Sequence, residues 1–231
     1  MESPREVLPA LNRVRALGLP DAWDGHVTAP GWGGESFEGP LPDGHNGNVC
    51  VFCSASLKDP DYLEDGRALG RLLAGSRMGC VSGAGSSGVM GEVVRGAVEA
   101  GGWTGGSNVP HIIEIEGLPD GLSSFWLRPD IYTRMEIMIQ KSDAFVIFPG
   151  GAGTVQEMLA LLILKEKHHP HMEGKPVFVF NRVDTMERSF WGPLIDLLSV
   201  MGEHTPFTVI DDLDSLLPGI MEKLADRDLA A

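Results

Sequence analysis

The sequence predicts an α/β protein with a Rossmann-like, doubly wound parallel sheet that carries helices on both faces. Short apolar runs, such as residues 49–53 and 144–148, alternate along the chain with segments whose apolar residues recur at helical spacing. Runs that are apolar throughout are typical of strands buried on both faces, as in a parallel sheet covered by helices. A chain of 231 residues is long enough to form one large domain of this kind.

The elements follow in order from this alternation. Residues 1–47 are expected to form an extension, with an amphipathic helix at 6–17 and a Gly- and Pro-rich stretch at 20–47 that is too irregular for a regular element. The Rossmann-like domain is expected over residues 48–231. Its strands are predicted at 49–53, 80–82, 111–115, 144–148, 176–180 and 207–210, with a loop running through Pro119, Gly121 and Trp126. Its helices are predicted at 61–76, from Gly91 to about 100, at 131–142, from Thr154 to before Pro170, at 188–200 and at 213–224.

The most informative stretch runs from residue 143 to residue 157. After the apolar strand come Pro149, three glycines (Gly150, Gly151 and Gly153), Thr154 and then an apolar pattern of helical spacing. Glycines leave backbone N–H groups uncovered, and a helix N-terminus adds free donors and a partial positive charge. Strand, glycine loop and helix together predict an anion site, most often one for phosphate.

The same stretch has a purely structural interpretation. Thr154 and Glu157 have the spacing of a capping box, in which each side chain satisfies a backbone donor at the start of the helix. The glycine loop would then be an ordinary turn. Capping and ligand binding by Glu157 are compatible.

Four features are expected to meet at the carboxyl edge of the sheet, where ligands of such folds bind. They are a small polar turn at 54–56, a glycine loop at 83–91, the helix that carries Arg134, and the loop at 150–154 followed by Glu157. The 83–91 loop contains a GxGxxG, which alone is a weak dinucleotide pattern because no acidic residue is clearly placed about 20 positions further on. By residue type alone, Arg134 would be a surface arginine or part of an ion pair.

Two long motifs in this order resemble those of the Lonely Guy (LOG) family, whose members are often mislabelled lysine decarboxylases. Residues 149–157, PGGAGTVQE, match the family's PGGxGTxxE signature, and residues 83–91, GAGSSGVMG, are similar to its GGGxxGLMG motif. The family carries an arginine nine positions before the Asp that opens the central strand, as Arg134 does before Asp143. The resemblance covers about residues 49–176. This chain departs from the family pattern at Ala84, at Tyr132, where the family has His, and at Met135, where it has Lys.

The resemblance implies an enzyme, a nucleoside 5′-monophosphate phosphoribohydrolase. Such an enzyme hydrolyses the N-glycosidic bond of AMP or of a cytokinin riboside 5′-monophosphate to free base and ribose 5-phosphate, which activates the cytokinin. It implies catalytic roles for Glu157 and Arg134. Glu157 would stabilise the oxocarbenium-like charge on the ribose, bind its hydroxyls or orient water, and Arg134 would hold the phosphate or assist departure of the base. The implied phosphate contacts are Gly150, Gly151, Gly153 and Thr154, and the implied contacts to the rest of the substrate are Ser54, Gly85, Ser86, Ser87, Gly88 and Met90. No metal and no organic cofactor is implied, and a homo-oligomer, dimeric or larger, is expected.

A second function class remains open, a non-catalytic carrier of a nucleotide or of molybdenum cofactor with a similar glycine loop. The simultaneous presence of Arg134 and Glu157 favours the enzyme, whereas the missing lysine at Met135 keeps the carrier possible. For pyridoxal phosphate-dependent decarboxylation, no stretch singles out a Schiff-base lysine.

The composition of the chain argues against two classes of partner, nucleic acids and membranes. A net charge of −14 and a pI near 4.8 argue against non-specific nucleic-acid binding, which needs a basic footprint. No apolar run approaches the roughly 20 residues of a membrane span, and the start of the chain lacks a signal-peptide core. A cytoplasmic location without a membrane partner is expected.

Two groups of possible metal ligands are interpreted as structural. The cysteines Cys50, Cys53 and Cys80 are expected to be reduced and buried, because residues three apart on a strand point to opposite faces and Cys50 and Cys53 therefore cannot easily share a metal. The cluster after the central helix is expected to be a solvated basic helix end, because Pro170 breaks the face that could converge its imidazoles; it comprises Lys165, Lys167, His168, His169 and His171.

Overall fold

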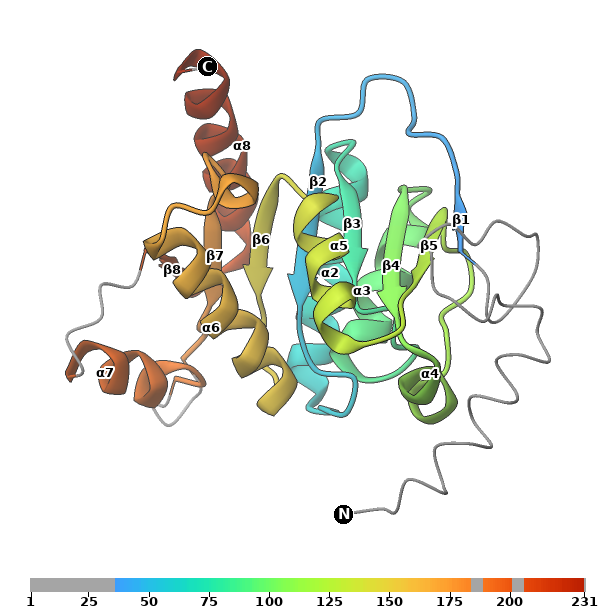
Figure 1. The fold of residues 1–231 in the computed structure, drawn as a ribbon, viewed down its shortest axis with the longest axis horizontal. Coiled ribbons are helices and arrows are strands. Elements are labelled where there is room, and N and C mark those ends of the chain that lie inside the picture. The colour runs from blue at the N-terminus through green and yellow to red at the C-terminus, as the bar shows by residue number, and fades with distance from the viewer. Residues whose placement is uncertain (1–35, 184–188, 201–205, 231) are drawn as a thin grey trace.

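The computed structural model describes residues 36–183, 189–200 and 206–230, and it contains one eight-stranded sheet in the order β1-β5-β4-β3-β2-β6-β7-β8 (Figure 1). The strands are β1 (Phe37–Glu38), β2 (Asn48–Phe52), β3 (Gly79–Ser82), β4 (Thr104–Asn108), β5 (Ser124–Leu127), β6 (Ala144–Ile147), β7 (Val177–Phe180) and β8 (Thr208–Ile210). All neighbours pair in parallel except β1, which pairs antiparallel with β5. The predicted parallel α/β fold is confirmed.

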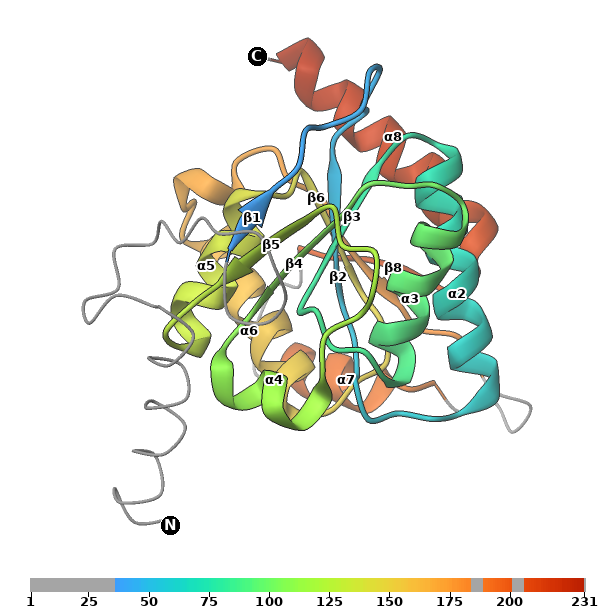
Figure 2. The ribbon, with the colours of Figure 1, turned by 90° about the vertical axis from the view of Figure 1, so that its right-hand side faces the viewer.

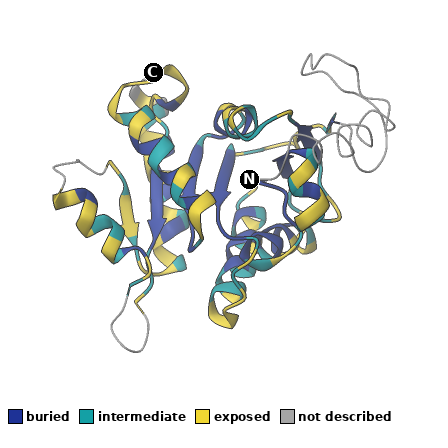
Figure 3. Cartoon of the chain, turned by 60° about the horizontal axis from the view of Figure 1, so that its bottom comes forward, coloured by how far each residue is buried: buried dark blue, intermediate teal, exposed yellow. Residues whose placement is uncertain are grey.

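Helices cover both faces of the sheet (Figure 2). Helices α2 (Pro60–Gly75), α3 (Gly88–Glu99) and α8 (Leu213–Ala230) pack on one face, and α5 (Ile131–Gln140), α6 (Ala152–Glu166) and α7 (Gly192–Val200) pack on the other. Helix α4 (Pro110–Glu116) lies beyond the carboxyl ends of the strands, and a single 3₁₀ turn, η1 (Pro170–Met172), follows α6. The inner strands β2 to β7 are buried throughout, whereas the edge strands β1 and β8 are partly exposed (Figure 3). Within the described residues, no helix combines the length and the apolar character needed to cross a bilayer.

Strand β2 shows why its uniformly apolar sequence predicts a central position. Val49, Val51 and Cys53 belong to the core under α2, α3 and α8, whereas Cys50 and Phe52 belong to the core under α5 and α6. Both sets are fully or almost fully buried. The expectation that Cys50 and Cys53 point to opposite faces is therefore confirmed.

The strand predicted at 111–115 is wrong, because these residues lie in helix α4. Pro110 stands at its first position, and Gly117 ends it with a positive φ of 70°, which is the pattern of a helix with a proline start and a glycine stop. Within the turn, Ile113 points inward while Ile115 is 82% exposed. The apolar residues of this stretch are thus not the alternating face of a strand.

The two strands that replace it were missed because one of them has almost no apolar side chains. Strand β4 reads TGGSN and is nonetheless fully buried. A Cβ atom at Gly105 would lie 2.8 Å from the Trp126 ring, and one at Gly106 would lie 2.6 Å from the Cβ of Ala84. Neighbouring side chains fill the space that strand side chains normally occupy, so tertiary packing overrides the weak strand propensity of glycine. Strand β5 contains Trp126, which the sequence analysis had placed in a loop.

The N-terminal extension is described only from residue 36, so the predicted helix at 6–17 lies outside the described residues. The expectation that residues 20–47 hold no regular element is wrong at β1, which adds a short edge strand to the sheet. Phe37 of this strand packs against Phe125, with ring centroids 6.3 Å apart. The remaining strands and helices agree with prediction to within a few residues, although α8 continues to Ala230.

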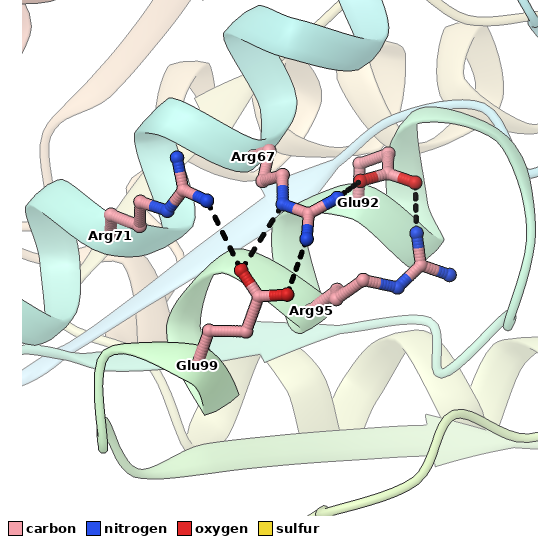
Figure 4. Close-up of polar contacts among 5 residues, drawn as sticks. All are labelled: Arg67, Arg71, Glu92, Arg95 and Glu99. Carbon is pink, nitrogen blue, oxygen red and sulfur yellow. Dashed lines mark hydrogen bonds and ion pairs between the residues drawn. The ribbon is translucent and has the colours of Figure 1, made fainter.

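Helices α2 and α3 pack with their backbones in contact. A Cβ atom at Gly70 would lie 2.1 Å from the Val93 carbonyl oxygen, and one at Gly96 would lie 2.1 Å from the Arg67 carbonyl oxygen. Over this contact runs a surface network in which Arg67 bonds Glu92 and Glu99, Arg71 bonds Glu99, and Arg95 bonds Glu92 (Figure 4). Exposed ion pairs of this kind contribute little to stability. The close packing of α2 on α3 therefore depends mainly on Gly70 and Gly96.

We predict that Gly96→Ala lowers the free energy of unfolding by about 2–3 kcal/mol, because the added methyl group must push the two helices apart. Gly75→Ala at the exposed end of α2 is the matched control, since a Cβ there meets nothing within 4 Å. Urea denaturation would measure both. Equal effects of the two substitutions would contradict the role of Gly96 in helix packing.

Candidate active site at the crossover of the sheet

The connections of the sheet change direction between β2 and β6, which are neighbours although β3, β4 and β5 come between them in sequence. At such a crossover the loops after the two strands leave in opposite directions and open a crevice at the carboxyl edge. A cavity of about 210 Å³ lies there. It is lined by Cys53, Ser54, Ala55, Ser56, Met90, Glu116, Arg134, Gly151, Ala152, Gly153, Thr154 and Glu157. The four features expected to meet at this edge do so.

Ser54 ties three loops of the site together. Its backbone N–H donates to the Pro149 carbonyl at 3.3 Å, and its own carbonyl accepts from the Met90 N–H at 3.0 Å. Its Oγ accepts from the backbone N–H groups of Ser56 and Leu57, at 3.1 and 3.0 Å. Ser54 therefore lines the cavity and also fixes the positions of the loops that follow β2, β3 and β6.

The loop after β6 presents the N-terminus of α6 to the cavity. The N-cap is Gly151, which has no side chain with which to cap the helix. The capping-box interpretation is therefore wrong: Thr154 is the third residue of the helix, not its cap. Its buried side chain packs against Gly150, where a Cβ atom would lie 2.1 Å from Thr154 Oγ1. The N–H groups of Ala152, Gly153 and Thr154 precede the first intrahelical bond, from Val155 to Gly151, so they are available to an anion.

Arg134 reaches the cavity from the first turn of α5. Asp130 caps this helix by accepting from the N–H groups of Tyr132 and Thr133. The Arg134 guanidinium donates from Nε to the Ser107 carbonyl at 2.9 Å and from Nη2 to the Gly83 carbonyl at 3.1 Å. A Cβ atom at Gly83 would lie 2.0 Å from Nη2, so a glycine is needed there. Two carbonyls hold the cation in place, and it has no carboxylate within ion-pair distance among the described residues.

Glu157 lies in the second turn of α6 and faces the same cavity. Burial raises the pKa of Glu157 from its ordinary 4.5 to about 7; the charge of Arg134 lowers it, and that of Glu116 raises it further. Desolvation thus outweighs the nearby cation. A carboxyl group with a pKa near 7 exchanges its proton in the physiological range, which is typical of acid–base groups in active sites.

The glycine loop between β3 and α3 mainly supports the opposite wall of the cavity, and of residues 83–91 only Met90 lines it. The Gly85 N–H donates to Met90 Sδ at 3.1 Å, which directs the Met90 side chain toward the cavity. The Ser86 and Ser87 hydroxyls donate to the carbonyls of Glu116 and Ala55, at 2.6 and 2.8 Å. Gly88 has a φ of 60° and lies against Ala55. These residues support the wall.

The predicted site residues thus divide into two groups. Arg134, Glu157, Gly151, Gly153, Thr154, Ser54 and Met90 line the cavity, whereas Gly150, Gly85, Ser86, Ser87 and Gly88 shape the loops around it. Glu116, which was not predicted from the sequence, also lines the cavity from the end of α4. Its position follows from the helix that the sequence analysis had interpreted as a strand; Pro110 and Gly117 were the signals that could have revealed it.

The other candidate ligands lie elsewhere. Lys165, His168 and His169 line a larger hollow of about 540 Å³ at the far end of α6, where His168 and His169 are exposed. Cys50, Cys53 and Cys80 are buried free thiols, and burial raises the pKa of Cys80 to about 12. Within the described residues, no three His, Cys, Asp or Glu side chains are grouped to hold a metal ion.

Comparison of sequences relates the chain to one family. The profile of a family described as "Possible lysine decarboxylase" matches residues 90–210. The chain is 35% identical over 111 residues to a cytokinin riboside 5′-monophosphate phosphoribohydrolase of Mycobacterium tuberculosis, a match that covers 48% of this chain and 59% of that protein. It is 28% identical over 166 residues to a protein of the same name from Rhodococcoides fascians, covering 70% of this chain and 80% of that one. The chain therefore matches less than two thirds of the length of the M. tuberculosis relative.

Comparison of structures supports the fold. The Moco carrier protein from Chlamydomonas reinhardtii superposes with a TM-score of 0.58 at 21% identity, over 78% of this chain and 98% of that one. The molybdenum cofactor binding protein from Rippkaea orientalis gives the same TM-score and identity, over 76% and 95%. At such identities the likeness shows the fold alone.

We predict that Glu157→Gln stabilises the protein increasingly as the pH rises. Because the folded state holds the Glu157 proton more tightly than the unfolded state does, wild-type stability falls as the pH rises from about 4.5 to about 7. The variant lacks this loss, so its advantage should grow by on the order of 2 kcal/mol between pH 5 and pH 8. Urea denaturation at both pH values would measure it. A stability difference that does not change with pH would show that the surroundings of Glu157 do not raise its pKa in the folded protein.

Proposed function

The chain belongs to the "Possible lysine decarboxylase" family and, within it, to the Lonely Guy phosphoribohydrolases, and from this we propose that it hydrolyses the N-glycosidic bond of a nucleoside 5′-monophosphate. The products are a free base and ribose 5-phosphate. The observation that carries the proposal is one cavity in which the free N-terminus of a helix, a fixed arginine and a half-buried carboxyl group meet.

The phosphate would bind at the start of α6. The N–H groups of Ala152, Gly153 and Thr154 point out of the helix end, and the helix dipole favours an anion there. Arg134 lies on the same cavity and contributes a positive charge. Binding of the phosphate supplies energy away from the reacting bond, which positions the ribose for reaction.

The size of the cavity favours ribose 5-phosphate as the buried part of the substrate. Its volume of about 210 Å³ lies below the roughly 300–1,000 Å³ typical of sites that enclose drug-sized ligands. The base would therefore extend over the rim. Adenine and an N6-substituted adenine of the cytokinin type are the bases we propose, following the names of the relatives.

Glu157 would supply the proton that the departing base needs. From the sequence, Glu157 is expected to act as an ionised carboxylate; its pKa of about 7 adds the protonated form at neutral pH. A carboxylic acid whose pKa is raised by partial burial in this way is the usual proton donor in glycoside hydrolysis. As the C1′–N bond breaks, its electron pair passes to the base and the base takes the Glu157 proton; water adds to C1′ and gives up one proton, which leaves ribose 5-phosphate.

Decarboxylation, which the family description suggests, has less support in this site. Among the described residues, the cavity lining contains no lysine that could form a Schiff base. The half-buried Lys165 and Lys175 lie elsewhere and donate to the carbonyls of Lys175 and Ile139.

We also propose a cytoplasmic homo-oligomer, dimeric or larger. Buried reduced cysteines suit a reducing compartment, and nucleoside monophosphates are made in the cytoplasm.

The proposal is tested by incubating the protein with AMP and N6-isopentenyl-AMP and following release of free base. We predict base release by the wild type and a loss of about 10²–10⁴-fold in kcat for Glu157→Gln. Because Glu157 acts as an acid, kcat/KM should fall as the pH rises through about 7. Glu166→Gln, at the exposed far end of α6, is the matched control and should keep wild-type activity.

The absence of base release from any nucleoside monophosphate would refute the proposed reaction. Tight binding of a nucleotide or of molybdenum cofactor, recovered unchanged, would then assign the fold to a carrier.

A further inference from the structure

Resting on the proposed function, we propose that Glu116 is a further catalytic residue, which removes a proton from the water molecule that attacks the ribose. It would act with Glu157 as the second carboxyl group of the site. Glu116 lies outside both of the motifs that relate this chain to the family, residues 83–91 and 149–157.

The geometry places the Glu116 carboxylate inside the site. It is the last residue of α4 and lines the same cavity as Arg134 and Glu157. A Cβ atom at Gly85 would lie 2.7 Å from Glu116 Oε2, so the carboxylate lies directly over the Gly85 backbone and only glycine leaves room for it. This gives Gly85 a function that does not require contact with substrate.

The backbone at Glu116 is held firmly for the end of so short a helix. The Glu116 carbonyl accepts two hydrogen bonds from Ser86, one from Oγ at 2.6 Å and one from the backbone N–H at 3.3 Å. Gly117 then turns the chain with a φ of 70°, and its N–H bonds the Ile113 carbonyl at 2.8 Å. A Cβ atom at Gly117 would lie 2.8 Å from Ser86 Oγ. The glycine loop after β3 and the end of α4 thus fix each other.

The charges around Glu157 come from three elements. On β2 and the residue after it, the titratable groups near Glu157 are Cys50 and Cys53, which point to opposite faces of the sheet and are neutral thiols, since burial raises their pKa well above 9.0. From α5, the Arg134 cation favours ionisation of Glu157, and from α4, Glu116 opposes it. The negative charge on Glu116 therefore helps to keep the proton on Glu157, and the pair offers one acid and one base to the same small cavity.

The proposed step is balanced by this pair. The water oxygen bonds C1′ while the C1′–N bond breaks, Glu116 accepts a proton from the water, and Glu157 gives its proton to the departing base. Transfer of the proton from Glu116 to Glu157, directly or through water, restores the starting state. Two carboxyl groups that share acid and base roles across a sugar are the general arrangement of glycoside hydrolysis.

The experiment compares Glu116→Gln with Glu114→Gln, an exposed residue of the same helix, and with Glu116→Asp. For Glu116→Gln we expect kcat to fall by about 10²–10⁴-fold with KM within a few-fold of wild type. The limb of the pH profile near 7 should move to lower pH, because the charge that opposes ionisation of Glu157 is gone. Glu116→Asp should recover part of the rate, and Glu114→Gln should match wild type.

A second readout does not depend on turnover. Carbon-13 NMR of labelled glutamate side chains, with the Glu157 signal assigned by its absence from Glu157→Gln, follows the titration of Glu157 directly. We expect its titration midpoint to move to lower pH in Glu116→Gln.

An active wild type whose Glu116→Gln variant keeps its rate and its pH profile would overturn the role of Glu116 while leaving the proposed reaction intact. A fall in rate without any movement of the pH profile or of the NMR midpoint would also overturn it, since that is what mere loss of structure produces. A wild type that releases no base would instead refute the proposed reaction.

Discussion

The parallel pairing of β2 with β6 is the constraint on which the rest of the site depends. The ladder between them continues past the strand ends, where Phe148 N–H donates to the Phe52 carbonyl at 2.8 Å and Ser54 N–H donates to the Pro149 carbonyl at 3.3 Å. These bonds bring the turn after β2 beside the glycine loop after β6. Ser54 then receives the Met90 N–H, which adds the loop after β3. The register of the β2–β6 pair thus positions three of the loops that surround the cavity, those after β2, β3 and β6.

The site is assembled largely from backbone groups, and this explains its glycines. Arg134 is held by the carbonyls of Ser107 and Gly83, and Thr154 packs on Gly150. A Cβ atom at either glycine would collide with these side chains. Glycine lets side chains approach the backbone closely. In return, the cavity carries a half-buried carboxyl group, Glu157, whose ionisation is opposed by its surroundings. The surrounding sheet and its two helical layers must offset the free energy that this burial costs, which is usual where a fold supports a reactive group.

Much of this could be read from the sequence, and the failures have physical causes. The strand, glycine loop and helix of residues 144–157 could be predicted, because the apolar run, the glycines and the helical spacing are all local features of the sequence. Strand β4 could not be predicted in this way, since the space beside Gly105 is filled by Trp126 and that beside Gly106 by Ala84, both from other parts of the chain. Because β4 was not recognised, the third strand was predicted at residues 111–115, which form α4. Glu116 was therefore not assigned to the site, although Pro110 and Gly117 mark the ends of that helix. The roles of Ser86 and Ser87 as supports were also invisible, because they depend on which carbonyls lie nearby.

The central claim is that the N-terminus of α6 is a phosphate site. Titration of the nitrogen-15-labelled protein with ribose 5-phosphate, followed by amide NMR, tests it most directly, with ribose as the uncharged control. The account predicts that the amide signals of Ala152, Gly153 and Thr154 shift with ribose 5-phosphate and not with ribose. Unchanged signals there, or shifts confined to the hollow around Lys165 and His169, would contradict it.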